Sequence, residues 1–180
     1  MAKGFTQIPR VDFFESYASV VHYESLRMNL AIAAANNIEA WQINYVAAYL
    51  NSLPQAKVYI KLHDGTITEL LYLLYRLMDG TYNWWDTLDK DMADLGYYHS
   101  KADPSVHSRH ANREVTITST YTDDTTGVSS LKEEADRAKE KLERIYKTKD
   151  LGEAGLVLEI KIKRDRKAGT LSISQHAYLK

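Results

Sequence analysis

The segment from Glu114 to Asp124 constrains the fold of this 180-residue chain more than any other. Glu114–Tyr121 alternates between apolar residues on one face and threonines on the other, the two-residue period of a β-strand. Asp123 and Asp124 supply turn chemistry, and Thr125–Ser129 predicts a weak returning strand because it is polar and contains a glycine. We therefore expect an antiparallel hairpin with acids at its tip, where they can hold divalent cations.

Apolar periodicity and turn signals predict further elements. The predicted helices are Ser25–Ala35, Thr68–Met78, Tyr82–Leu95 and Ser130–Ile145, the last with Ser130 and Glu133 in a capping box. The other predicted strands are Ala40–Val46, Lys57–Leu62, and a final hairpin of Leu156–Lys163 with Leu171–Ser174. This order predicts one α+β domain, residues 1–180, with a mainly antiparallel sheet and helices packed on one face.

Composition narrows the class of protein. No apolar run reaches the ~20 residues of a membrane span, and the N-terminus lacks the apolar core of a signal peptide. We therefore expect an intracellular protein, cytoplasmic or nuclear, with no membrane partner. The chain has no cysteine, which excludes disulfides and thiolate metal sites. A net charge of −1 argues against a uniformly basic nucleic-acid-binding domain, although positive charge can be local.

Two local patterns have competing interpretations. His107 and His110 are imidazoles three residues apart, but no further cluster completes a zinc site, and their segment is typical of a polar loop. The basic run Lys161–Lys167 can contact a nucleic-acid backbone. It can also be a solvated hairpin edge on which lysines discourage aggregation, and we favour this second interpretation.

A series of short motifs follows the chain in order. The motifs are Ala2–Gln7, Val11–Ala18, Tyr23–Arg27, Trp41–Asn51, Leu74-Tyr75, Trp84-Trp85, Ser100–Pro104, Tyr121–Asp124, Lys149–Glu153 and Gly169–Gln175. The series resembles the reverse transcriptase domain of copia-type retrotransposons over nearly the whole chain. The resemblance implies a polymerase palm with part of the fingers, truncated at both ends, in which the thumb and the ribonuclease H domain are absent.

This resemblance implies an RNA-directed DNA polymerase, a nucleotidyltransferase that acts on an RNA or DNA template–primer and deoxynucleoside triphosphates. Its chemistry uses two Mg²⁺ ions held by acids from two strands. By resemblance, Asp123 and Asp124 are catalytic metal ligands, and Tyr121 belongs to the same substrate-contacting turn. Tyr49 matches an aromatic residue beneath the incoming sugar, although it can also be a core tyrosine. Lys3 remains from the block that grips the triphosphate.

The chain departs from the family at Asn44, which stands where the first catalytic aspartate is expected. An amide oxygen can touch Mg²⁺ but brings no charge to a site where each charge matters. Met78-Asp79 also replaces a Lys-Gln pair, which puts an acid where the triphosphate needs neutral or basic partners. We therefore expect weak or absent polymerase activity. The alternative is a non-catalytic retrotransposon remnant that at most binds nucleic acid or a protein.

Overall fold

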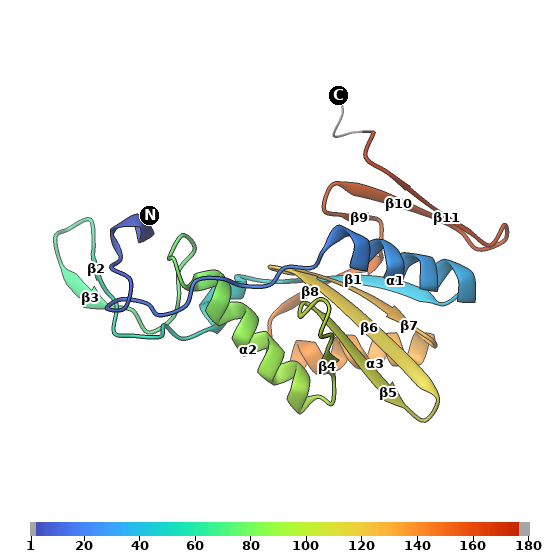
Figure 1. Ribbon diagram of the computed structural model, residues 1–180, viewed down its shortest axis with the longest axis horizontal. Coiled ribbons are helices and arrows are strands. Elements are labelled where there is room, and N and C mark those ends of the chain that lie inside the picture. The colour runs from blue at the N-terminus through green and yellow to red at the C-terminus, as the bar shows by residue number, and fades with distance from the viewer. Residues whose placement is uncertain (1–2, 177–180) are drawn as a thin grey trace. The chain divides into compact units, whose positions relative to one another are not determined.

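A computed structural model describes residues 3–176 of the chain. The chain divides into two compact units, Met1–Ser19 with Ala47–Asp91 and Val20–Val46 with Met92–Lys180. Helices and mainly antiparallel sheets confirm the predicted α+β class (Figure 1). Within residues 3–176, none of the helices is long and apolar enough to cross a membrane.

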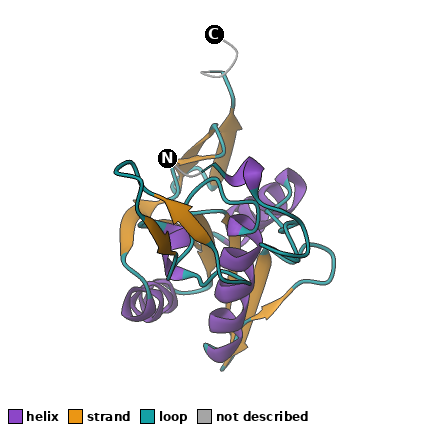
Figure 2. Ribbon diagram, turned by 90° about the vertical axis from the view of Figure 1, so that its left-hand side faces the viewer, coloured by secondary structure: helices purple, strands orange, loops and turns teal. Residues whose placement is uncertain are grey.

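The second unit is built on a six-stranded antiparallel sheet with the order β4-β5-β6-β7-β1-β8. Figure 2 colours the strands of the chain orange and its helices purple. Its strands are β1 (Glu39–Tyr45), β4 (Tyr98–His99), β5 (Val106–Ala111), β6 (Glu114–Tyr121), β7 (Asp124–Ser129) and β8 (Thr148–Glu153). Strands β1, β6 and β7 were predicted from the sequence, whereas β4, β5 and β8 were not. The predicted hairpin of β6 and β7 thus lies in the middle of a sheet.

The segment with His107 and His110 is strand β5, so the prediction of a polar loop was wrong. It joins β6 through Asn112 (φ 51) and Arg113 (φ 68), and two left-handed residues are what a tight type I′ hairpin needs. No glycine marks this turn in the sequence. Residues three apart in a strand point to opposite faces of the sheet. The two imidazoles therefore do not converge on one zinc ion.

Helices α1 (Tyr23–Asn36) and α3 (Lys132–Ile145) cover opposite faces of this sheet, whereas the sequence predicted helices on one face (Figure 1). On the α1 face, Asn29 Nδ2 donates to Ser119 Oγ at 2.6 Å. On the α3 face, the hydroxyls of Thr116 and Ser129 hydrogen-bond at 3.1 Å. The threonine face of β6 is buried, and the hydroxyls of Thr116 and Thr120 find partners within the sheet, whereas the Thr118 hydroxyl has none in the described residues.

The main hydrophobic core lies between α1, its face of the sheet, and a second, three-stranded sheet. That sheet contains β9 (Leu156–Val157), β10 (Ile160–Asp165) and β11 (Thr170–Ser174). The buried core residues are Val21, Leu26, Leu30, Ala33, Ala40, Val106, Val128, Ala154, Val157, Ile160 and Ile162. The predicted continuous strand Leu156–Lys163 is broken, because Leu158 (φ 50) and Glu159 (φ 60) form a turn that folds β9 back onto β10.

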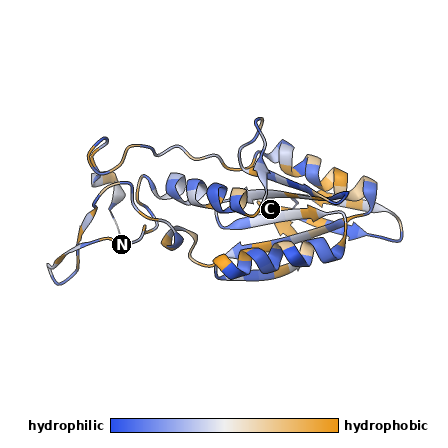
Figure 3. Cartoon of the chain, turned by 90° about the horizontal axis from the view of Figure 1, so that it is seen from below, coloured by the Kyte–Doolittle hydropathy of each residue, from blue (hydrophilic) through white to orange (hydrophobic). Residues whose placement is uncertain are grey.

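Helix α3 is largely hydrophilic on its outer side (Figure 3). Its predicted capping box is wrong, since the helix begins after Leu131 with no side-chain cap. Ser130 Oγ instead accepts the backbone N–H of Val115 at 3.0 Å. The hydroxyl that looked like a helix cap therefore joins α3 to strand β6.

The first unit contains two 3₁₀ turns, a short hairpin and most of α2. These elements are η1 (Gly4–Thr6), η2 (Ala48–Asn51), β2 (Tyr59–Lys61), β3 (Ile67–Glu69) and α2 (Gly80–Asp94). The predicted helix Thr68–Met78 is wrong. The Leu70 and Leu73 amides donate to the carbonyls of Val58 and Ser52, at 2.8 and 3.0 Å, and Arg76 has φ 79. Tertiary hydrogen bonds thus override the helical propensity of this apolar run.

Candidate active site

The ends of β1 and of the β6–β7 hairpin place one row of side chains on the same face of the sheet. Tyr121 pairs with Asp124, Asp124 with Asn44, and Asn44 with Lys149 of β8. Paired residues project to the same side, with Cβ atoms about 5 Å apart. The fold thus brings Asn44 next to Asp124, as the motif positions require. It also adds Lys149, which the sequence pattern did not reveal as a site residue.

Asp123 lies at the tip of the turn between β6 and β7. The residue before it, Thr122, has φ 51, a conformation that β-branched residues rarely adopt. The Asp123 carbonyl accepts the backbone N–H of Tyr45 at 2.7 Å, so the turn is joined to the end of β1. Backbone strain held in place by such bonds is typical of functional sites.

The side chains of Asn44 and Asp124 contact each other directly. Asn44 Nδ2 donates to Asp124 Oδ1 at 2.9 Å. Both residues are half-buried, as is Asp123. The amide must turn its nitrogen toward the carboxylate, because two oxygens at this distance would repel each other. Asp124 therefore already has a hydrogen-bond donor where an acid at position 44 would face it across a cation.

Two aspartates and this amide do not fit a site for two Mg²⁺ ions. Mg²⁺ requires hard oxygen ligands in near-octahedral geometry, whereas Asn44 presents a nitrogen donor to Asp124. Within residues 3–176, no group of three or more His, Cys, Asp or Glu side chains is arranged to hold a metal ion. The two predicted acids are adjacent at the strand tip, but the third carboxylate is missing.

Tyr49 and Lys3 belong to the first unit. The Tyr49 ring lies 4.5 Å, centroid to centroid, from that of Tyr75, and its hydroxyl is 3.1 Å from Thr81 Oγ1 at the start of α2. Lys3 is exposed and lines a cavity of about 590 Å³ together with Lys61. Tyr49 therefore has packing and hydrogen-bond partners within the first unit, and Lys3 lines a cavity of the same unit.

Asp79, the acid that replaces a polar family residue, points into the first unit. It is fully buried, and its carboxylate accepts from Asn83 Nδ2 at 2.8 Å and from Gln7 Nε2 at 3.5 Å. Its carbonyl also accepts the Asn83 N–H, which starts helix α2. The structure therefore gives this acid hydrogen-bond partners within its own unit, at the start of α2.

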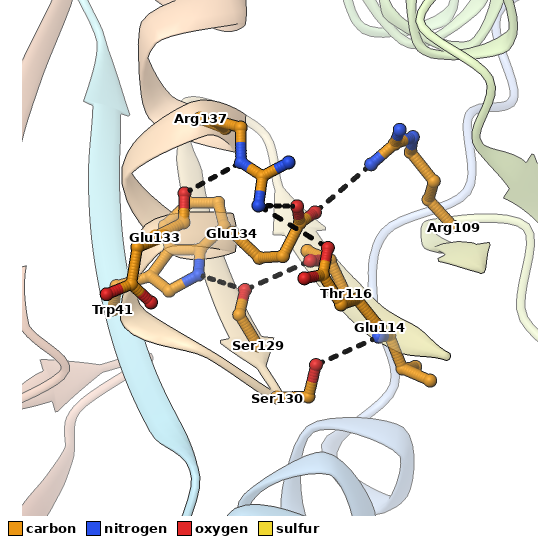
Figure 4. A network of polar contacts seen from close by, with 10 residues as sticks. Trp41, Arg109, Glu114, Thr116, Ser129, Ser130, Glu133, Glu134 and Arg137 are labelled. Carbon is orange, nitrogen blue, oxygen red and sulfur yellow. Dashed lines mark hydrogen bonds and ion pairs between the residues drawn. The ribbon is translucent and has the colours of Figure 1, made fainter. Parts of the chain in front are cut away.

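On the face opposite Asn44, a network of ion pairs around the buried Glu134 attaches α3 to the sheet (Figure 4). Glu134 is 2% exposed, and its carboxylate lies 3.1 Å from Arg109 and 2.6 Å from Arg137. Arg137 also lies 3.4 Å from Glu114. A hydrogen bond shared with Glu134 raises the pKa of Glu114, and nearby charge on Glu134 adds to the effect. No local sequence pattern indicates this network, because its charges come from three separate elements, β5, β6 and α3.

A chain of hydrogen bonds in the same region fixes β1 against β7 (Figure 4). Trp41 Nε1 donates to Ser129 Oγ at 3.0 Å, and that hydroxyl is in turn bonded to Thr116. Trp41 is paired with Gly127, and the same register pairs Asn44 with Asp124 three residues further along β1. The buried indole thus helps to set the register that places the site residues opposite each other.

Comparisons with known proteins identify relatives of the whole chain. A family model described as reverse transcriptase (RNA-dependent DNA polymerase) matches residues 1–180. The retrovirus-related Pol polyprotein from transposon TNT 1-94 of Nicotiana tabacum is 29% identical over 188 residues, which cover 99% of this chain and 14% of that protein. The chain therefore spans a small part of that polyprotein.

Two proteins of Arabidopsis thaliana also match. The retrovirus-related Pol polyproteins from transposons RE1 and RE2 are each 24% identical over 132 residues, which cover 69% of this chain and 9% of each polyprotein. No solved structure matches the chain.

Proposed function

The chain belongs to the reverse transcriptase (RNA-dependent DNA polymerase) family, and we propose from this that it is a palm with part of the fingers whose nucleotidyl transfer is weak or absent. Its substrates would be an RNA or DNA template–primer and deoxynucleoside triphosphates. Such substrates occur inside the cell, where we propose that the protein acts.

The contact between Asn44 and Asp124 carries this proposal. The two side chains meet at the ends of neighbouring strands, where a polymerase of this family needs converging carboxylates. An acid at position 44 would add a negative charge for binding cations. The amide adds none, and its Nδ2 donor takes one oxygen of Asp124. Removing one charge from a catalytic site typically costs several kcal/mol of transition-state stabilisation.

Other residues have proposed substrate contacts. Tyr49 would lie beneath the sugar of the incoming nucleotide, and Lys3 would remain from the triphosphate-binding block. Tyr121 and Lys149 flank the pair of Asn44 and Asp124 in the cross-strand row. Lys149 is exposed, and we propose that its ammonium contacts a substrate phosphate.

Primer extension on a homopolymeric RNA template with a DNA primer and Mg²⁺ tests the proposal. We expect little or no extension by the wild-type chain and an increase of roughly 10²-fold for Asn44→Asp. Asn112→Asp is the matched control, because it adds the same charge in an exposed turn between β5 and β6. Robust Mg²⁺-dependent extension by the wild-type chain would refute the proposed impairment.

A second candidate function is nucleic-acid or protein binding without catalysis, which the missing carboxylate at Asn44 also favours. Fluorescence anisotropy with a labelled template–primer distinguishes the two. A non-catalytic binding module would bind with a steep salt dependence and give no extension even as Asn44→Asp. An impaired polymerase would bind and regain extension in the same variant.

A further inference from the structure

The Asn44–Asp124 contact has a consequence for how the site is held together. In an antiparallel pair, like charges directly opposite each other destabilise the sheet. Two half-buried carboxylates at this register position would repel each other, and a bound cation would have to offset the repulsion. The chain has a neutral amide there, and its Nδ2 donates to Asp124 Oδ1 at 2.9 Å.

The Asn44–Asp124 pair lies at the end of the row of paired residues that joins β1 to β7. The Tyr45 N–H donates to the Asp123 carbonyl beside it, at 2.7 Å, and the strained residue Thr122 lies in the same turn. Lys149 faces position 44 from the other side. It is exposed on the edge strand β8, so its charge is well solvated and offsets little of the repulsion expected between two acids.

We propose that the Asn44 amide takes the electrostatic role of a cation at this tip. It holds the end of β1 to the β6–β7 turn without a metal, so the tip is equally ordered with and without divalent cations. An acid at position 44 would make the same tip dependent on cations. This inference rests on the proposed function only in identifying position 44 as the family's acid position.

The test exchanges the two partners. Wild type, Asn44→Asp, Asp124→Asn and the double variant Asn44→Asp/Asp124→Asn are compared by thermal unfolding and by hydrogen exchange of the Tyr45 amide. Each is measured in EDTA and in millimolar Mg²⁺ or Ca²⁺. The double variant restores one amide and one carboxylate with donor and acceptor exchanged.

We expect Asn44→Asp in EDTA to unfold at a temperature about 5 °C lower and to lose protection at Tyr45, with both effects reversed by either cation. In the wild type and in the double variant, the Tyr45 amide should be as well protected in EDTA as with Mg²⁺ or Ca²⁺. The unfolding temperatures of these two proteins should likewise not change when a cation is added. Because no step depends on catalysis, this result is independent of primer extension.

The proposal is overturned if Asn44→Asp matches the wild type in EDTA, if the double variant behaves like Asn44→Asp, or if the wild-type tip gains protection with Mg²⁺. If Asn44→Asp does not fold in EDTA, the double variant still decides the matter. Folding of the double variant supports the pair as the cause, and its failure to fold contradicts it.

Discussion

Gly127 is the position on β7 where the structure predicts the sharpest effect of a small substitution. A Cβ added there would lie 2.1 Å from the Trp41 ring atoms Cε2 and Cζ2. Carbon atoms that are not bonded pack at about 3.5 Å, so the indole would have to move by more than 1 Å. It cannot move freely, because it is 3% exposed and its Nε1 donates to Ser129 at 3.0 Å.

The cost of Gly127→Ala can be estimated from these contacts. Overpacking a core costs about 1–3 kcal/mol, and breaking the Trp41 hydrogen bond adds about 1 kcal/mol. We therefore expect a loss of about 2–4 kcal/mol in the free energy of unfolding. For a chain of this size each kcal/mol lowers the melting temperature by about 2–4 °C, so the melting temperature should fall by roughly 5–15 °C.

Urea and thermal unfolding of Gly127→Ala measure this loss, with Gly155→Ala as the control. An added Cβ at Gly155 would make an ordinary contact of 3.9 Å with the Glu153 carbonyl, so we expect a change within about 0.5 kcal/mol. Trp41→Phe removes the outer indole ring. In the double variant with Gly127→Ala, the cost should be at least about 1 kcal/mol below the sum of the single costs. Additive costs, or a fully stable Gly127→Ala, would contradict the steric explanation.

Three further predictions concern charged and buried groups of the second unit. Glu134→Ala removes a buried carboxylate and leaves Arg109, whose side chain is 25% exposed, without its 3.1 Å partner; because water can reach the arginine, we expect a cost of about 1–3 kcal/mol in urea unfolding, whereas a loss below about 0.5 kcal/mol would contradict that role. Burial alone would raise the pKa of Asp150, but hydrogen bonds from Lys139 and a backbone amide lower it overall. Its stabilising contribution is therefore present above 3.8 and lost as the pH falls below that value, so Asp150→Asn should cost about 0.5 kcal/mol at pH 7 and nothing in acid. Burial raises the pKa of Tyr97 to about 12, so its neutral form stabilises the fold below pH 10, and this contribution is lost as the pH rises toward 12. Ultraviolet titration should show one late-ionising tyrosine that disappears in Tyr97→Phe.

The sequence predicted the elements whose pattern is local. Alternation located β6, β1 was predicted as a short strand, and helical spacing with an asparagine stop located α1, whose C-cap Asn37 is left-handed. The sequence pattern did not show whether the threonine face of β6 is buried, because alternation cannot distinguish hydroxyls that face water from hydroxyls that bond each other. Thr120 and Thr125 do the latter across the buried hairpin, at 2.8 Å.

Strands β5 and β8 were missed for a related reason. Both carry charged or polar side chains on an element that looks like a loop, and their strand character comes from pairing with β6 and β1. The apolar run Thr68–Met78 shows the opposite error, because the sequence predicted a helix there that the structure does not form. Its spacing suits a helix, but distant carbonyls take its backbone amides. Long-range pairing decided these segments, and no window of sequence contains it.

At the candidate site, the sequence predicted which residues lie together but not the contacts that their side chains make. The motif order was enough to mark Asn44, Asp123 and Asp124 as positions that belong together. It could not show that the two adjacent acids differ. Asp124 is half-buried beside an amide donor, while Asp123 is joined to β1 through its carbonyl. An amide at position 44, where the family resemblance leads us to expect a metal-binding acid, therefore also gives Asp124 a hydrogen bond. Restoring the acid at position 44 adds a charge and removes that bond in one step. Stability and activity should consequently respond to the substitution in opposite directions.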